Sequence, residues 1–164
     1  MTRTLILLRH AKSSWGDPNA KDHDRPLNDR GRRDAQRIGK WLADNDLIPE
    51  HAFCSSARRA EETLDGLGHK VPTFLMSDLY MASPQTILRV MSGAYDSRIL
   101  IVAHNPGIGE AARMIVRQPP RHSRFADFPT AACLVADFEV ETWENVKPGT
   151  GRVRAFVTPH DLPD

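Results

Sequence analysis

The chain has 164 residues, of which 40% are hydrophobic and 26% are charged, as in ordinary globular domains. Its 22 Lys and Arg nearly balance its 21 Asp and Glu. This balance argues against a general binder of nucleic acid or of membrane surfaces, since such proteins usually carry a strong positive charge. A fold of this size buries about 70% of the surface that its unfolded chain exposes, so its core needs no disulfide or metal. We expect one domain over residues 1–164.

Neither an export signal nor a metal site is evident in the sequence. The apolar run at residues 5–8 is too short for the core of a signal peptide or for a membrane span, so the expected location is cytoplasmic. Cys54 and Cys133 form no CxxC pair, and we expect both to be buried free thiols. Five scattered histidines lack the spacing of metal ligands; they are His23, His51, His69, His122 and His160. We therefore predict no metal and no cofactor.

Apolar runs alternate with amphipathic stretches through the first two thirds of the chain. This pattern is typical of an α/β domain whose strands are mostly parallel and buried on both faces. We predict strands at residues 4–8, 52–55, 71–76 and 99–102. Four helices are predicted. The first runs from Asn28, a good N-cap, to about Asp44, and the second covers residues 60–67. The third begins at Ser83-Pro84, and the fourth follows Gly107.

The last third of the chain has a different pattern. Residues 117–129 are polar and are predicted as a loop, whereas residues 131–139 and 152–158 are predicted as strands, with a turn at Lys147-Pro148-Gly149 between them. These strands would close the sheet, at least one of them antiparallel. The predicted fold class is an α/β three-layer sandwich, with a mostly parallel central sheet, at least one antiparallel strand and helices on both faces.

Three of the predicted strands end in residues suited to binding phosphate. Ligands collect at the carboxyl ends of the strands in open α/β sheets, and these ends carry Arg9-His10, Ser55-Ser56-Ala57-Arg58-Arg59 and His104-Asn105. If the strands are parallel neighbours, two imidazoles and two or three guanidinium groups meet in one crevice. Each position taken alone is more often a structural hydrogen-bonding group than a catalytic one. Three such strand ends together predict a phosphate site that contains a nucleophile.

The chemistry of such a site is phosphoryl transfer. A neutral imidazole attacks phosphorus and carries the phosphoryl group, which divides one displacement into two easier ones. Paired Arg donors position the phosphoryl oxygens and stabilise their charge. A second imidazole donates to the same oxygens, and the N-terminus of the helix after Gly107 adds partial positive charge. A site of this kind needs no metal.

Four ordered motifs resemble those of the histidine phosphatase superfamily, in its phosphoglycerate-mutase-like branch 1. They are Leu7-Leu8-Arg9-His10-Ala11-Lys12-Ser13-Ser14-Trp15, Arg25-Pro26-Leu27-Asn28-Asp29-Arg30-Gly31, Ser55-Ser56-Ala57-Arg58-Arg59-Ala60-Glu61-Glu62-Thr63 and Val102-Ala103-His104-Asn105-Pro106. The short length and the start of the first motif are most similar to SixA-type phosphohistidine phosphatases, and the resemblance spans essentially the whole chain. It implies a phosphoglycerate mutase-like fold and a metal-independent hydrolase.

The resemblance also implies a role for individual residues. His10 would be the phosphorylated nucleophile, and Arg9 and Arg59 would clamp the phosphoryl group. His104 would be the second histidine, which contacts the same group. Arg58, the neighbour of the second clamp, is expected to be a surface charge.

The chain departs from the family pattern at several positions. Ser13, a further expected substrate contact, stands where the family often has Thr, whereas Gly16 stands where many members have Asn. Arg25 either lines the substrate pocket or has a structural role, and both roles are open. The two usual proton donors of the family are absent, because Met81 stands where mutase-like members have Glu and Asn105 where acid phosphatases have Asp.

The expected function is hydrolysis of a phosphoryl group through a phosphohistidine intermediate. Protein phosphohistidine is the favoured substrate, because its imidazole leaves neutral without a proton donor of the enzyme, whereas an alkoxide leaves poorly. The expected partners are a phosphorylated protein or a small phosphorylated substrate, with inorganic phosphate as product, and neither nucleic acid nor a membrane. The alternatives are a phosphatase for a small metabolite and a non-catalytic module that binds phosphate or phosphoprotein. Within the loop 117–129, Arg121-His122-Ser123-Arg124 form either a basic rim for a protein substrate or part of a solvated loop.

Overall fold

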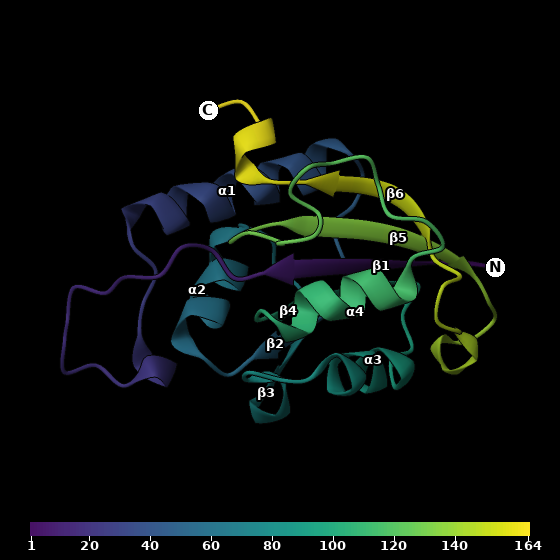
Figure 1. The fold of residues 1–164 in the computed structure, drawn as a ribbon, viewed down its shortest axis with the longest axis horizontal. Helices are drawn as coiled ribbons and strands as arrows, with labels where there is room; N and C mark the ends of the chain where they lie inside the picture. The colour runs from purple at the N-terminus through teal and green to yellow at the C-terminus, as the bar shows by residue number, and fades with distance from the viewer.

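The computed structural model describes residues 1–164, with a six-stranded sheet at its centre in the order β3-β2-β4-β1-β5-β6 (Figure 1). The strands are β1 Thr2–Arg9, β2 His51–Ser55, β3 Thr73–Met76, β4 Arg98–Ala103, β5 Cys133–Glu139 and β6 Arg152–Val157. Strands β1 to β4 are mutually parallel, and β5 runs antiparallel to both of its neighbours, β1 and β6. The predicted mostly parallel sheet with an antiparallel strand is confirmed.

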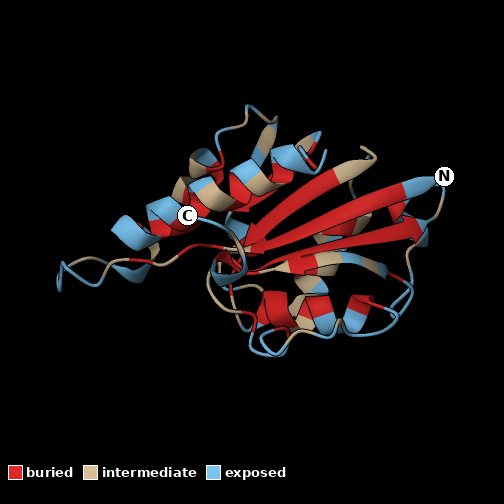
Figure 2. Cartoon of the chain, turned by 90° about the horizontal axis from the view of Figure 1, so that it is seen from above, coloured by how far each residue is buried: buried red, intermediate tan, exposed pale blue.

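Helices cover both faces of this sheet, as predicted. They are α1 Asp29–Asp44, α2 Arg58–Gly66, α3 Pro84–Ser92 and α4 Gly107–Ile115. Helices α1 and α2 share a core with Ile6 and Leu8 of β1, whereas α3 and α4 share a core with Leu5 and Leu7 of the same strand. Successive side chains of a strand point to opposite faces, so β1 contributes to two cores at once. Figure 2 shows this strand, which starts at the label N, buried along nearly its whole length.

Two predicted strands begin later than the sequence pattern indicated. The strand expected from residue 131 begins at Cys133, because Ala131 adopts a positive φ of 60° that ends an extended run. The Ala131 N–H instead donates to the carbonyl groups of Arg9 and His10, at 3.1 and 3.0 Å. The strand expected from residue 71 begins at Thr73. The first of these shifts places a turn against the end of β1, where the candidate site lies.

Two negative features bear on function. No helix of this chain combines the length and the apolar character that crossing a membrane requires. Cys54 and Cys133 are buried and free, as predicted. Burial raises the pKa of each thiol to about 12, so that neither is a nucleophile near neutral pH.

Candidate active site

The carboxyl ends of β1, β2 and β4 lie side by side, since β4 pairs with both of the other strands. Arg9 at the end of β1 pairs with Ala103 at the end of β4. The residues that follow these strands meet, and the ring centroids of His10 and His104 are 5.1 Å apart. Arg59 in the first turn of α2 lies between them, with its Nε 3.4 Å from His10 Nε2. The structure thus brings these four predicted side chains together at the edge of the sheet, where the sequence predicts the crevice.

His10 is buried, and its ring is held in one orientation. Its Nδ1 lies 2.8 Å from the Ala11 carbonyl oxygen. A carbonyl only accepts hydrogen bonds, so Nδ1 carries the proton of the neutral ring and the lone pair is on Nε2. Burial, followed by the nearby His104 and Arg59, lowers the pKa of His10 to about 3. At neutral pH, Nε2 is therefore an unprotonated nitrogen that faces Arg59.

His104 is anchored from the other side by Ser55. Its Nε2 lies 2.7 Å from the Ser55 hydroxyl oxygen, and this oxygen also accepts a hydrogen bond from the Ala57 N–H at 3.2 Å. Burial, followed by the Arg59 cation, lowers the pKa of His104 to about 4. The other ring nitrogen, Nδ1, lies 3.5 Å from Arg59 Nη2. Sequence reasoning did not assign a role to Ser55, although the motif before α2 contains it.

Arg9 retains donor capacity that no protein group uses. Its Nη1 donates to the Phe128 carbonyl at 3.2 Å, whereas its Nε is buried without a hydrogen-bond partner. A buried donor without an acceptor costs about 1–3 kcal/mol, a cost that a bound anion removes. Burial and the nearby Arg59 lower the pKa of Arg9, because two cations share this crevice. A chain of net charge +1 thus contains a local positive region.

Asp22, which sequence reasoning missed, lies against Arg59 in the short 3-10 helix Asp22–Asp24. Its backbone carbonyl and its Oδ2 accept hydrogen bonds from Arg59 Nη1 and Nη2, at 2.7 and 3.0 Å. Its Oδ1 accepts from Arg25 Nη1 at 2.9 Å, and the Tyr80 hydroxyl donates to Oδ2. The bond from Tyr80, followed by the Arg59 cation, lowers the pKa of Asp22 to about 2. The only sequence signal was the i,i+3 spacing of Asp22 and Arg25, which is common on surfaces.

Ser13 and Arg25 are buried beside the crevice, but they bind each other. Arg25 donates to the Ser13 hydroxyl and, through Nε, to the Ser14 carbonyl at 3.1 Å. Its guanidinium carbon lies 3.4 Å from the centroid of the Trp15 ring. Together with its bond to Asp22, these contacts engage all three nitrogens of the guanidinium group. Of the two roles open for Arg25, its contacts match the structural one.

The two positions where the family places a proton donor lie close to the crevice. The Met81 sulfur is 3.9 Å from Arg59 Nη2, and a thioether has no proton to give. The Asn105 amide donates to two backbone carbonyls of the loop 117–129, both at 2.9 Å. Neither side chain supplies an acid to the crevice. No group of three or more His, Cys, Asp or Glu is arranged to hold a metal ion.

Two further expectations concern surface charges. Arg58 pairs with Glu62 at 2.9 Å along the exposed side of α2, as expected for a neighbour of the clamp. Within the loop 117–129, Arg124 pairs with Asp127 at 3.0 Å. This basic side chain is engaged inside its own loop, which matches the solvated-loop alternative.

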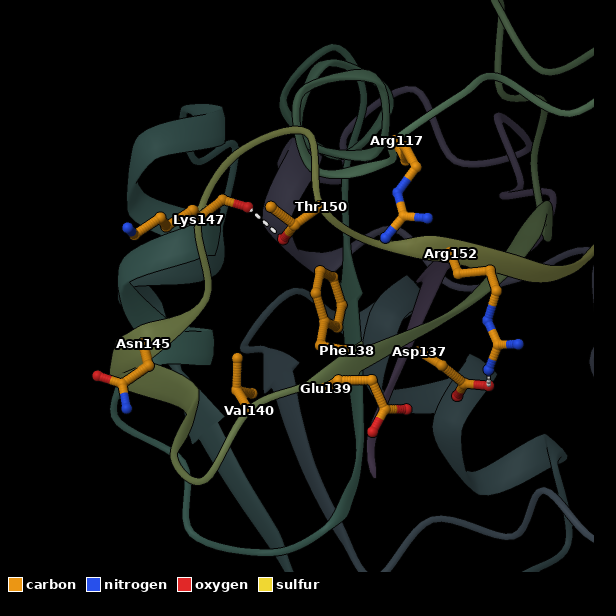
Figure 3. Close-up of a pocket in the computed structure, with 9 residues that line it drawn as sticks. All are labelled: Arg117, Asp137, Phe138, Glu139, Val140, Asn145, Lys147, Thr150 and Arg152. Atoms are coloured by element: carbon orange, nitrogen blue, oxygen red, sulfur yellow. Dashed lines mark hydrogen bonds and ion pairs between the residues drawn. The ribbon is translucent and has the colours of Figure 1, made fainter. Parts of the chain in front are cut away.

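A separate cavity of about 510 Å³ has the lining residues that Figure 3 shows. Glu139 in its lining pairs with Thr2 at the start of β1, so the cavity lies at the opposite end of this strand from Arg9. Its charges are mixed, and the guanidinium of Arg152 lies 3.6 Å from the Asp137 carboxylate, a contact that is dashed in Figure 3. None of the predicted site residues lines this cavity.

Comparison with known proteins identifies the family. A model described as the histidine phosphatase superfamily (branch 1) matches residues 5–80. An uncharacterised protein of Mycobacterium tuberculosis is 33% identical over 159 residues, which cover 93% of this chain and 99% of the relative. This chain belongs to the histidine phosphatase superfamily.

Within this superfamily, the chain is SixA-like. The structure of the putative phosphohistidine phosphatase SixA from Nakamurella multipartitia matches with a TM-score of 0.84 and 26% identity, over 97% of both chains. The putative phosphohistidine phosphatase SixA from Agrobacterium tumefaciens matches with a TM-score of 0.78 and 24% identity, over 96% of this chain and 98% of the other. The predicted resemblance and the phosphoglycerate mutase-like fold are confirmed, and this histidine phosphatase membership supports phosphatase activity.

Proposed function

We propose that this histidine phosphatase is a metal-independent hydrolase of protein phosphohistidine, in which His10 carries the phosphoryl group. The observation that supports this most directly is the bond between His10 Nδ1 and the Ala11 carbonyl, because it leaves the lone pair on Nε2. A neutral and oriented imidazole is what attack on phosphorus requires. The same proposal includes a cytoplasmic location, a single domain over residues 1–164 and no cofactor. Its substrate is a phosphorylated protein or a small phosphorylated molecule, and its product is inorganic phosphate.

The reaction proceeds in two displacements. In the first, His10 Nε2 forms a bond to phosphorus, and the bond to the leaving nitrogen breaks with its electron pair. Arg9 and Arg59 stabilise the charge on the phosphoryl oxygens, and the unpartnered Arg9 Nε gains an acceptor. In the second, water attacks phosphorus, the bond to His10 breaks, and inorganic phosphate leaves.

His104 supplies a further donor in this scheme. In this scheme the Ser55 hydroxyl, which accepts from the Ala57 N–H, donates its own proton to His104 Nε2. The His104 proton is then on Nδ1, which faces Arg59 Nη2 at 3.5 Å. Two donors that face each other are both satisfied by an oxygen between them, and a phosphoryl oxygen fills that role.

The leaving group decides between substrate classes. An alkoxide needs a proton as it leaves, and neither Met81 nor Asn105 supplies one. A phosphohistidine ring that has taken a proton from solvent leaves as neutral imidazole. This difference favours a phosphoramidate over a phosphomonoester. The hydrolysis of a small-metabolite monoester and phosphate binding without turnover are the competing functions.

The His10→Ala variant tests the nucleophile. Hydrolysis of a phosphohistidine peptide is expected to stop, while the circular dichroism spectrum stays that of the wild type. The matched control is His160→Ala, which removes an exposed histidine outside the crevice and is expected to keep the wild-type rate. Full activity of His10→Ala overturns the mechanism.

Two measurements separate the competing functions. Quenching in an alkaline denaturant with a labelled phosphohistidine peptide is expected to trap an acid-labile phosphoenzyme in the wild type and none in His10→Ala. Tight binding of inorganic phosphate without any phosphoenzyme supports the binding module instead. Rates on the peptide and on a panel of monoesters complete the comparison, and a strong preference for a monoester supports the small-metabolite phosphatase.

A further inference from the structure

The charges at the crevice are arranged in two layers. Arg9 and Arg59 lie beside the buried imidazoles of His10 and His104. Asp22 lies on the outer side of Arg59, and its side chain is 48% exposed, against 5% for that of Arg59. A phosphoryl group bound at the inner cations therefore has its leaving group near a carboxylate.

The Asp22 carboxylate has room for one more donor. A carboxylate offers about four acceptor positions. Arg25, Arg59 and Tyr80 use three of them, and the exposure of the side chain leaves the remaining one accessible. The hydrogen bond from Tyr80, followed by the Arg59 cation, holds the pKa of Asp22 at about 2, so the group is an anion throughout the physiological range.

The Tyr80 ring lies beside this carboxylate. It is edge-on to His104, with centroids 5.5 Å apart, and edge-on to His23, with centroids 4.8 Å apart, and the Arg59 guanidinium carbon lies 5.9 Å from its centroid. The hydroxyl of the same Tyr80 binds Asp22. A carboxylate beside an aromatic ring suits a flat cation, which gains a charge-assisted hydrogen bond from the one and a cation–π contact from the other.

We propose that Asp22 is the residue that selects the leaving group, by accepting a hydrogen bond from the protonated imidazole ring of the phosphohistidine substrate. This inference rests on the proposed function and deepens it. It assigns to the chain a preference for phosphoramidates whose ring is protonated in the substrate and leaves neutral, over monoesters whose leaving group departs as an anion.

The step balances without a proton donor of the protein. The substrate ring bears the phosphoryl group on one nitrogen and a proton on the other, and this N–H faces Asp22. As His10 Nε2 forms its bond to phosphorus, the bond from phosphorus to the ring nitrogen breaks, and the electron pair passes to the ring. The ring leaves as neutral imidazole with its proton still in place. Asp22 stabilises the protonated ring before the step, which explains how a site with Met81 and Asn105 at the usual acid positions operates.

Asp22 also positions Arg59, and the experiment has to separate this role from the selection of the leaving group. Because Asp22 also binds Arg59, its loss alters the clamp, and that effect acts on every phosphoryl substrate alike. The ratio of kcat/KM for two substrates cancels such a common effect. The informative quantity is therefore the ratio for a phosphohistidine peptide over p-nitrophenyl phosphate, whose leaving anion needs no proton.

The experiment compares Asp22→Asn with two further variants of the full chain. Asp22→Asn is expected to lower this ratio about tenfold or more, since a charged hydrogen bond is replaced by a neutral one. Asp22→Glu keeps the charge and is expected to stay closer to the wild type than Asp22→Asn. Asp24→Asn removes the same charge two positions along the chain, where Asp24 is exposed and pairs with His23 at 3.6 Å, and is expected to keep the wild-type ratio.

The pH profile provides a second readout. The kcat profile reports groups in the enzyme–substrate complex, where the substrate ring faces Asp22, Tyr80, His23, Arg25 and Arg59. Asp22→Asn is expected to move the basic limb of kcat for the peptide to lower pH by about one unit, because the ring loses its anionic partner. The profile for p-nitrophenyl phosphate is the reference for changes in the enzyme's own groups.

The outcomes are distinguishable. Equal losses on both substrates in Asp22→Asn overturn the inference and leave Asp22 as a residue that positions Arg59. A fall in the ratio for Asp24→Asn as large as for Asp22→Asn also overturns it, because the effect is then one of general charge. A wild type that hydrolyses p-nitrophenyl phosphate but not the phosphohistidine peptide overturns the proposed function itself.

Discussion

Lowering the pH tests whether the two imidazoles of the crevice are neutral because they are buried. The pKa of His10 is lowered to about 3 and that of His104 to about 4, from a usual value of 6.5. Protons therefore bind more readily to these side chains in the unfolded chain than in the folded one. The stability that the two neutral rings contribute is fully present above about pH 6.5 and is lost as the pH falls toward 3 to 4.

The size of this loss follows from the two pKa values. One pKa unit corresponds to about 1.36 kcal/mol. Between pH 6.5 and pH 4, proton uptake by the unfolded chain lowers the free energy of unfolding by about 3 kcal/mol for His10 and about 2.5 kcal/mol for His104. Domains have total stabilities of only about 5–15 kcal/mol, so the denaturation midpoint moves by a readily measured amount.

Urea denaturation at a series of pH values measures this loss in the wild type and in two variants. His10→Asn keeps a donor near Nδ1, which binds the Ala11 carbonyl, and His104→Gln keeps a polar atom near Nε2, which binds Ser55. Carboxylates titrate alike in all three proteins. The free energy of unfolding of His10→Asn is expected to fall by about 3 kcal/mol less than that of the wild type over this range. Equal falls in both proteins would refute the assignment of a neutral buried His10.

Two further predictions concern positioning and packing. Ser55→Ala leaves the buried His104 Nε2 without a partner, and is expected to lower kcat about tenfold and the free energy of unfolding by about 1–3 kcal/mol; an unchanged kcat shows that Ser55 does not orient the ring. Gly39→Ala puts a Cβ 2.0 Å from the Leu67 carbonyl oxygen, which is expected to cost about 1–3 kcal/mol of stability. Its control is Gly93→Ala, where the nearest atom is 3.7 Å away, and equal urea midpoints for the two variants contradict the packing argument.

The sequence by itself determined where the main strands lie along the chain, and it determined four of the side chains in the crevice. The apolar runs before His10 and His104 predict buried parallel strands, and the carboxyl ends of such strands meet at one edge of the sheet. The convergence of these residues with Arg59 therefore followed from local patterns and one rule of topology. The register between β1 and β4 pairs Arg9 with Ala103, so the ends of the two strands lie level and His10 and His104 follow them side by side.

Only the tertiary structure decided how these groups are held and what surrounds them. Asp22 is 37 positions from Arg59 along the chain, and Ser55 is 49 positions from His104. No periodicity links such pairs, because their contacts depend on where a polar loop folds back. The direction of Arg25 was open in the sequence for the same reason, since both Ser13 and the crevice lie within reach of a guanidinium group.

The protonation states likewise belong to the tertiary structure. A histidine in a motif has an ordinary pKa until burial removes water from its charged form, and only the packed crevice does this for His10. Its tautomer is set by a carbonyl of the segment that follows β1. Residue types and strand order are encoded locally, whereas charge state and orientation arise from desolvation and from hydrogen bonds across the fold, which exist only once the chain is packed.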